Sequence, residues 1–264
     1  MKRVVWFLIA FVIAGSLLVG CAARGPSNGS SEPGKTESEP GKTETETVKP
    51  EEPSSGSSAV DSFEVYTQAK SQFVERLMDA FAADGNPVVY TLNFLSISMV
   101  DLSMWPALIL GLEESQVLAS QFLTTGADIR YAKDGNRTVL SVTDSDGREV
   151  TTTSVYHENE DWYTYTASED GGPVTFYAEY RKTSYGYVAQ YFVDHQDGSA
   201  NHYLLTLEGE DGTVGYTTAS GIPSPLTGKE TTDFAKAAEE WYSIHGKAVT
   251  GRDPDGNALS FTIP

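Results

Sequence analysis

The stretch from Glu179 to Gly198, "EYRKTSYGYVAQYFVDHQDG", decides the fold. Its runs "EYRK" and "YGYVAQYFVD" are short and rich in Tyr, Val and Phe, which are residues that favour β-strands. The polar tract "HQDG" follows them, and an Asp-Gly pair supplies the positive φ that a tight hairpin needs. The stretch therefore predicts successive antiparallel strands joined by short turns.

The same alternation of runs and turns continues on both sides of this stretch. Between Ala127 and Ser220 the runs are "ADIRYA", "RTVLSVTD", "EVTTTSVYHE", "DWYTYTA", "VTFYAEYRK", "YGYVAQYFVD", "NHYLLTLEG" and "GTVGYTTA". The tracts "KDGN", "DSDGR", "EDGGP", "HQDGSAN" and "EDG" separate them. We therefore expect a meander of antiparallel strands over this region.

Helices are expected on both sides of the meander. Residues 60–85 and 103–126 have apolar positions at helical spacing with Gly at the end, whereas residues 88–102 fit a buried strand or a helix, the first half favouring a strand. Residues 231–246, "TTDFAKAAEEWYSIHG", predict an amphipathic helix, and residues 247–263 predict a last hairpin. The expected fold class is α+β, with helices packed on one face of a curved antiparallel meander and a C-terminal helix and hairpin.

The first residues predict export from the cytoplasm. Lys2 and Arg3 precede an uncharged, mostly apolar run from Val4 to Gly20, which is the pattern of a signal peptide. The run is at the short end for a membrane span, so a retained N-terminal anchor is the alternative.

Leu18-Val19-Gly20-Cys21 resembles the lipobox of bacterial lipoproteins. The resemblance implies a diacylglyceryl group on Cys21, cleavage before this residue, and a protein held by lipid on the extracytoplasmic side of a cell membrane. Cys21 is the only Cys, so neither an internal disulfide nor a Cys-based metal site is expected. In outline, a helix followed by a meander with the Glu179–Gly198 stretch is similar to uncharacterised lipoproteins of Gram-positive, clostridia-like bacteria.

The segment after Cys21 predicts a disordered tether. Gly29–Thr36, "GSSEPGKT", matches the phosphate-binding loop pattern, but no strand or helix is expected beside it and "EPGKTES" repeats as "EPGKTET". The predicted organisation is a signal peptide at 1–20, the lipidated Cys and tether at 21–59, and a single α+β domain at 60–264. A formal net charge of -19 argues against nucleic acid as a partner, and no nucleotide is expected.

No metal or other cofactor is expected. The turns with Asp144 and Asp146, and with Asp253, Asp255 and Asn257, are fragments of a calcium loop that hairpin geometry explains. His157, His195, His202 and His245 lack the spacing of a zinc or catalytic site, although His195 and His202 lie near each other across a hairpin with Asp194 adjacent.

The abundant Tyr residues of the meander are the basis for a ligand-binding hypothesis. Strand alternation places aromatic residues on one face, as either a core face under the helices or a ligand-binding face formed by Phe176, Tyr180, Tyr185, Tyr187 and Tyr191. The preferred hypothesis is a non-enzymatic lipoprotein that binds an unknown ligand or surface partner. The alternative is an extracytoplasmic hydrolase of cell-wall material with Glu179 and Asp194 as the carboxylate pair.

Overall fold

The structure is a computed structural model that describes residues 58–85, 96–97, 100, 104, 117 and 128–263. These residues belong to one compact unit that spans residues 56–264. The predicted signal peptide and tether lie outside the described residues. The predictions for residues 88–102 and 103–126 also lie outside them, apart from single positions. Of those positions, Ile97, Val100, Met104 and Val117 are buried.

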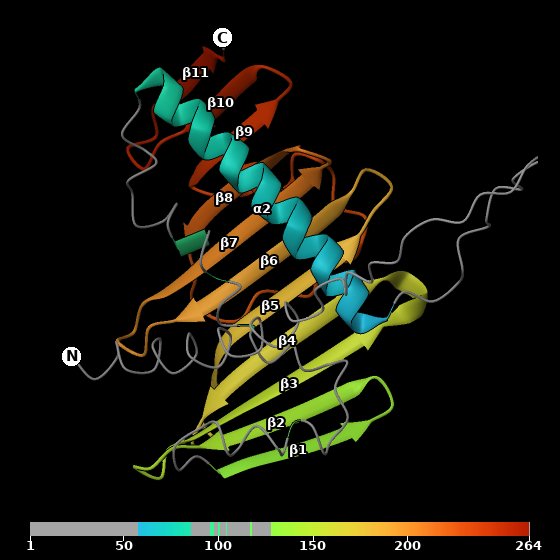
Figure 1. Cartoon of the computed structure of the whole chain (residues 1–264). Helices are drawn as coiled ribbons and strands as arrows, with labels where there is room; N and C mark the ends of the chain where they lie inside the picture. Colours follow the sequence, from blue (N-terminus) through green and yellow to red (C-terminus); the bar gives the residue numbers. More distant parts are fainter. Residues whose placement is uncertain are drawn as a thin grey trace, which may run out of the picture. The chain divides into compact units, whose positions relative to one another are not determined.

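A single antiparallel sheet dominates the structure, and its strands lie in the order of the sequence from β1 to β11 (Figure 1). The strands are β1 (Asp128–Asp134), β2 (Arg137–Thr143), β3 (Glu149–His157), β4 (Trp162–Glu169), β5 (Val174–Lys182), β6 (Tyr187–Asp194), β7 (Ala200–Glu208), β8 (Asp211–Thr218), β9 (Glu240–His245), β10 (Ala248–Arg252) and β11 (Ala258–Thr262). Each described strand therefore pairs with its neighbours in the chain, and the predicted antiparallel meander is confirmed.

The hairpin turns use glycine where the backbone needs a positive φ. Glycines with positive φ occupy most of the turns, namely Gly135, Gly147, Gly171, Gly198, Gly209, Gly246 and Gly256. An L-residue with a Cβ pays a steric penalty in this conformation, and glycine does not. The turn tracts of the sequence thus set where each strand ends and the next begins.

Helix α2 (Ala59–Asp84) confirms the helix predicted at residues 60–85, and both of its ends are capped. The Ser58 hydroxyl accepts a hydrogen bond from the Asp61 amide, while the Asp61 carboxylate accepts one from the Ser58 amide. This capping box satisfies amides that the first turn would otherwise leave unpaired. Gly85 ends the helix with a φ of 71°.

Helix α2 lies across one face of the sheet (Figure 1). The aromatic side chains of that face are buried in a cluster with the helix. The rings of Tyr66 and Tyr180 stack with centroids 4.2 Å apart, and the Tyr66 hydroxyl contacts the Tyr191 hydroxyl. Phe73 is fully buried over Gly212, where an added Cβ would lie 2.4 Å from the Thr206 carbonyl oxygen and 3.1 Å from the Phe73 ring, which is closer than ordinary van der Waals contact. The close approach of helix and sheet at this point therefore requires glycine.

A long connection, which we call the strap (residues 219–239), covers part of the opposite face. It links β8 to β9 and contains a short 3-10 turn, η5 (Phe234–Ala237). Ala235 and Ala238 are buried against Leu204 of β7, and a Cβ on Gly215 would lie 2.2 Å from the Ala235 carbonyl oxygen. The central strands are thus covered by α2 on one face and by the strap on the other.

The α+β prediction is wrong, because the described residues are predominantly β with α2 as the one α-helix with defined bounds among them. The helix predicted at residues 231–246 is also wrong, since this segment forms η5 and then β9. Tyr242 and Ile244 alternate onto the α2 side, where they meet Val214 and Gly212 of β8. Trp, Tyr and Ile fit a strand well, and a helix here would leave the backbone groups of β8 unpaired.

Replacing Phe73 with Ala should lower the free energy of unfolding by about 3–5 kcal/mol, because it leaves a cavity between α2 and β8. Urea unfolding followed by circular dichroism measures this change. The neighbouring exposed residue supplies the control, since Gln72→Ala removes no buried contact. Equal stability of the two variants would contradict the packing of α2 on the sheet.

Candidate functional site

The structure places most of the predicted aromatic ligand site in the core. Phe176, Tyr180, Tyr187 and Tyr191 are between 1% and 7% exposed and pack in the cluster under α2. Burial raises the pKa of Tyr187 to about 12, with Asp161 and Tyr156 adding to the effect. Tyr185 lies apart from these four residues, and its hydroxyl donates to the carbonyl oxygen of Glu230 in the strap. The structure therefore brings four of the five predicted residues together, with their rings in contact with the core.

The two carboxylates of the hydrolase hypothesis are not brought together. Glu179 on β5 pairs in register with Gln190 on β6. Asp194 ends β6 four residues further on, roughly 13 Å along the strand, and its carboxylate accepts the amide of Gln196 in the next turn. Acid pairs in glycosidases are about 5–9.5 Å apart. The geometry of these two residues does not match that separation.

Glu179 instead forms the centre of a buried polar network. Its side chain is fully buried. Oε2 accepts hydrogen bonds from the Tyr177 hydroxyl at 2.7 Å, from Gln190 Nε2 at 3.0 Å and from the Leu226 amide at 2.9 Å. Oε1 accepts a hydrogen bond from Arg181 Nε at 3.0 Å. The charge is therefore paired and solvated by protein groups, which a buried carboxylate requires.

This network holds the strap against the sheet. Gln190 Nε2 also donates to the carbonyl oxygen of Ser224, and Gln190 Oε1 lies 3.2 Å from Nε2 of His202. Burial lowers the pKa of His202, so the ring is neutral near pH 7. The strap therefore depends on hydrogen bonds from side chains of β5 and β6 in addition to its apolar contacts.

Beside the network, three side chains from neighbouring strands stack on one another. The Arg181 guanidinium carbon lies 3.7 Å from the centre of the Trp162 ring, and the His157 ring lies parallel to Trp162 at 3.7 Å. Burial and the nearby Arg181 lower the pKa of His157, while Glu160 opposes the shift. Because β4 lies between β3 and β5, His157 and Arg181 cover opposite faces of the Trp162 ring.

A cleft of about 490 Å³ lies at the His157 end of this stack. It is formed by the β1–β2 turn, the start of α2 and the 3-10 turn η4 (Glu158–Glu160). The lining residues are mostly polar and carry both charges, namely Ala59, Lys133, Gly135, Asn136, Thr138, Tyr156, His157, Glu158, Asn159 and Glu160. The volume lies within the range of small-molecule sites in proteins.

Sequence reasoning missed the cleft, although one signal for it was present. In a meander every second turn lies at the same end of the sheet, so the tracts "KDGN" and "HENED" had to be neighbours. The Tyr156 amide donates to the Asn136 carbonyl oxygen and joins the two turns. The polar residues of both tracts thus converge on one cleft.

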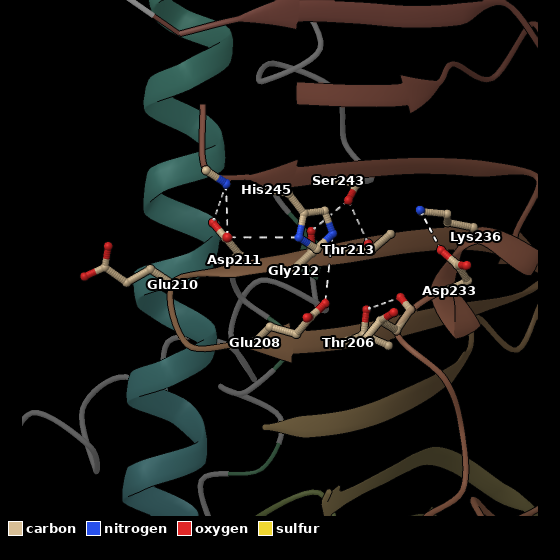
Figure 2. Close-up of polar contacts among 12 residues, drawn as sticks. Thr206, Glu208, Glu210, Asp211, Gly212, Thr213, Asp233, Lys236, Ser243 and His245 are labelled. Carbon is tan, nitrogen blue, oxygen red and sulfur yellow. Dashed lines mark hydrogen bonds and ion pairs between the residues drawn. The ribbon is translucent and has the colours of Figure 1, made fainter. Parts of the chain in front are cut away.

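A second polar cluster lies further along the sheet at the β7–β8 and β9–β10 turns (Figure 2). The His245 ring lies between two carboxylates, 3.9 Å from Glu208 and 4.0 Å from Asp211. Asp211 also accepts the Gly246 amide and pairs with Arg76 of α2. Burial alone would raise the pKa of Asp211, but the Gly246 amide and the Arg76 guanidinium outweigh it and lower the pKa.

This second cluster fastens α2 to the two turns. The nearby Ser243 hydroxyl accepts a hydrogen bond from Thr213 and donates one to the Gly212 carbonyl oxygen, so its contacts are with β8 (Figure 2). A catalytic arrangement needs a nucleophile within hydrogen-bond reach of the base. Ser243 makes its hydrogen bonds elsewhere, and the cluster therefore fits a structural role.

The acidic turns follow hairpin geometry. Asp144 accepts the amides of Asp146 and Arg148, and Asp253 accepts the amide and side-chain nitrogen of Asn257. Over residues 58–85 and 128–263 and the few described positions between them, there is no group of three or more His, Cys, Asp or Glu side chains with metal-binding geometry. His195 and His202 occupy the β6–β7 turn and the start of β7.

Comparison with known proteins supplies neither a family nor a function for this chain. The chain matches no protein-family model, no curated protein and no solved structure. Among the described helices, none is long and apolar enough to cross a membrane.

Replacing Glu179 with Gln should destabilise the protein by about 3 kcal/mol, because it removes the closer and buried of the two carboxylates that pair with Arg181 and directs an amide N–H₂ group at existing donors. The strap should open first, so the Leu226 amide should lose protection in hydrogen exchange. Glu169→Gln, at an exposed carboxylate on β4, is the matched control. Unchanged exchange at Leu226 would show that the network does not hold the strap.

Proposed function

We propose that the protein is a lipid-anchored extracytoplasmic lipoprotein whose sheet domain binds a small polar ligand of the cell envelope without catalysing a reaction. The cleft beside η4 carries the binding part of this proposal. The Leu18–Cys21 sequence carries the anchoring part. The two parts are independent and are tested separately.

Membrane attachment through Cys21 suits the charge of the chain. A formal net charge of -19 opposes binding to an anionic membrane surface. Two acyl chains contribute about 0.8 kcal/mol for each buried CH₂ group, which is enough for stable anchoring without electrostatic attraction. The lipid on Cys21 would thus supply the whole attachment, and the following tether would separate the domain from the surface.

The cleft offers the groups that a polar, multiply functional ligand requires. Lys133 provides a cation, Glu158 and Glu160 provide anions, and Asn136 and Asn159 provide amide donors and acceptors. A neutral His157 ring can donate and accept a hydrogen bond. Fragments of cell-wall glycopeptide combine sugar hydroxyls, carboxylates and amines, and an extracytoplasmic protein meets them. They are therefore the ligand class that we propose.

The hydrolase alternative gains no support from the geometry. Glu179 is fully buried and accepts hydrogen bonds from four donors, so it is neither accessible to substrate nor free to move a proton. Asp194 lies at a hairpin turn away from it. A binding role is the function that the described residues fit best.

Replacing Cys21 with Ala should abolish lipidation, since the acyl acceptor is the Cys thiol. The full-length variant should then accumulate as an uncleaved precursor or leave the membrane fraction. Membrane fractionation and mass spectrometry of the N-terminus measure both outcomes. A mature, acylated Cys21→Ala protein would contradict the lipoprotein assignment.

Replacing Lys133 with Ala should weaken binding of soluble disaccharide-peptide fragments of the cell wall by about tenfold or more, because one charged hydrogen bond to the ligand is lost. Isothermal titration calorimetry measures the dissociation constant. Lys229→Ala removes another exposed lysine, in the strap, and should leave binding unchanged. Absence of binding to the wild-type protein, or equal weakening in both variants, would contradict the cleft as the binding site.

A further inference from the structure

The last strand, β11, forms one edge of the sheet that the described residues build. It pairs with β10 on one side, and none of the strands in the described part of the chain pairs with its other side. The Ile263 amide donates to the Lys247 carbonyl oxygen of the β10 side. Because neighbouring residues of a strand direct their backbone groups to opposite sides, Ala258, Ser260 and Thr262 direct theirs outward.

The side chains of β11 do not protect this edge. Natural sheets block pairing at an edge with charged residues, proline or a bulge. The opposite edge strand, β1, carries the charged residues Asp128, Arg130, Lys133 and Asp134. The β11 sequence, "ALSFT", has no charge and no proline, and its register with β10 is regular. The two edges of the same sheet therefore differ in their capacity to pair.

We propose that β11 pairs antiparallel with β11 of a second copy of this chain, about a two-fold axis at Ser260. In this register Ser260 faces the partner's Ser260, and Ala258 faces the partner's Thr262. These are the residues whose backbone groups point outward, so each facing pair exchanges both N–H···O bonds. The sequence of β11 is thus complementary to itself in an isologous interface.

The side chains between these pairs add apolar contact. Leu259 and Phe261 are half-buried and point to the α2 side, where the Phe261 ring packs edge-on against Phe81 at 5.4 Å. In the proposed register Leu259 lies opposite the partner's Phe261, as a pair without mutual hydrogen bonds and with closely spaced side chains. If β1 paired with β1 of a second copy about a two-fold axis at its central residue, Asp128 would lie opposite the partner's Asp134, where like charges repel.

The interface is small and belongs to the weak class. Five residues from each copy bury far less than the roughly 1,200 Å² of a stable complex, and a net charge of -19 on each chain opposes association. Attachment of both copies to one membrane would raise their effective concentration and favour such a contact. The pairing is argued from the edge of the sheet and not from the proposed ligand, while its strength in a membrane rests on the proposed anchor.

Cysteine cross-linking of the full-length chain in membranes tests the register. The facing residues of a bonded pair lie about 5.5 Å apart between Cα atoms, within the span of a disulfide. Ser260→Cys, at an exposed position, should therefore give several-fold more disulfide-linked dimer than the wild type under mild oxidation. The yield should rise with salt, because screening reduces the repulsion between the two acidic chains.

Two further variants distinguish this register from random collision. In Ala258→Cys the two thiols lie roughly 13 Å apart along the paired strands, so the dimer yield should stay at background. Adding Thr262→Cys to the same chain should restore cross-linking between position 258 of one copy and position 262 of the other. If Ser260→Cys gives no more dimer than Ala258→Cys, or if Ala258→Cys alone cross-links as well, the proposed pairing is wrong.

Discussion

The structure depends on covering both faces of a one-layer sheet in its centre. An antiparallel sheet can leave one face in water, but β5 to β8 carry buried residues on both faces. Helix α2 covers the first face, where the stacked rings of Tyr66 and Tyr180 join helix and sheet. The strap covers the second. These two layers make the central strands the rigid part to which the turns, the cleft and the edges are attached.

The two covers are held by different forces. Helix α2 contributes a continuous apolar stripe, so its attachment is mainly hydrophobic. The strap has few large apolar residues and is held by directional bonds. Side chains of the sheet bond its carbonyl oxygens at Ser224 and Thr232, and the Tyr185 hydroxyl bonds that of Glu230. Such bonds fix one conformation of an irregular segment, because each donor has a single partner position.

The sequence allowed prediction of the features that local chemistry determines. Hairpins could be found because an Asp-Gly or Asn-Gly pair acts within four residues, and α2 could be found because its apolar residues recur at helical spacing and Gly85 ends it. The segment containing Trp241 and Ile244 was assigned wrongly to a helix, since the same residues satisfy a helical stripe and a strand alternation. Pairing with β8 decides in favour of the strand. Because β8 lies outside this segment, the pattern within the segment does not reveal the pairing.

The candidate site was harder to predict for a related reason. Alternation places Phe176 and Tyr180 on one face of β5 but does not tell whether a helix covers that face. From the sequence, Glu179 is a carboxylate that could act as a catalytic acid. Its contacts with Leu226 and Arg181 show that it instead holds the strap to the sheet. The cleft arises from two turns that are polar and unremarkable separately. Its position follows from the meander order, which makes alternate turns neighbours.

The sequential strand order also sets a sequence of events during synthesis. Each hairpin can form as soon as its two strands leave the ribosome, because its contacts are local. Helix α2 is made before every strand, yet Ser62 bonds a residue 99 positions later and Arg76 bonds one 170 positions later. The C-terminal end of the apolar stripe, at Phe81, therefore stays uncovered until Tyr242 of β9 and Phe261 of β11 have been made. The risk of misfolding is therefore greatest between the synthesis of α2 and the synthesis of β9.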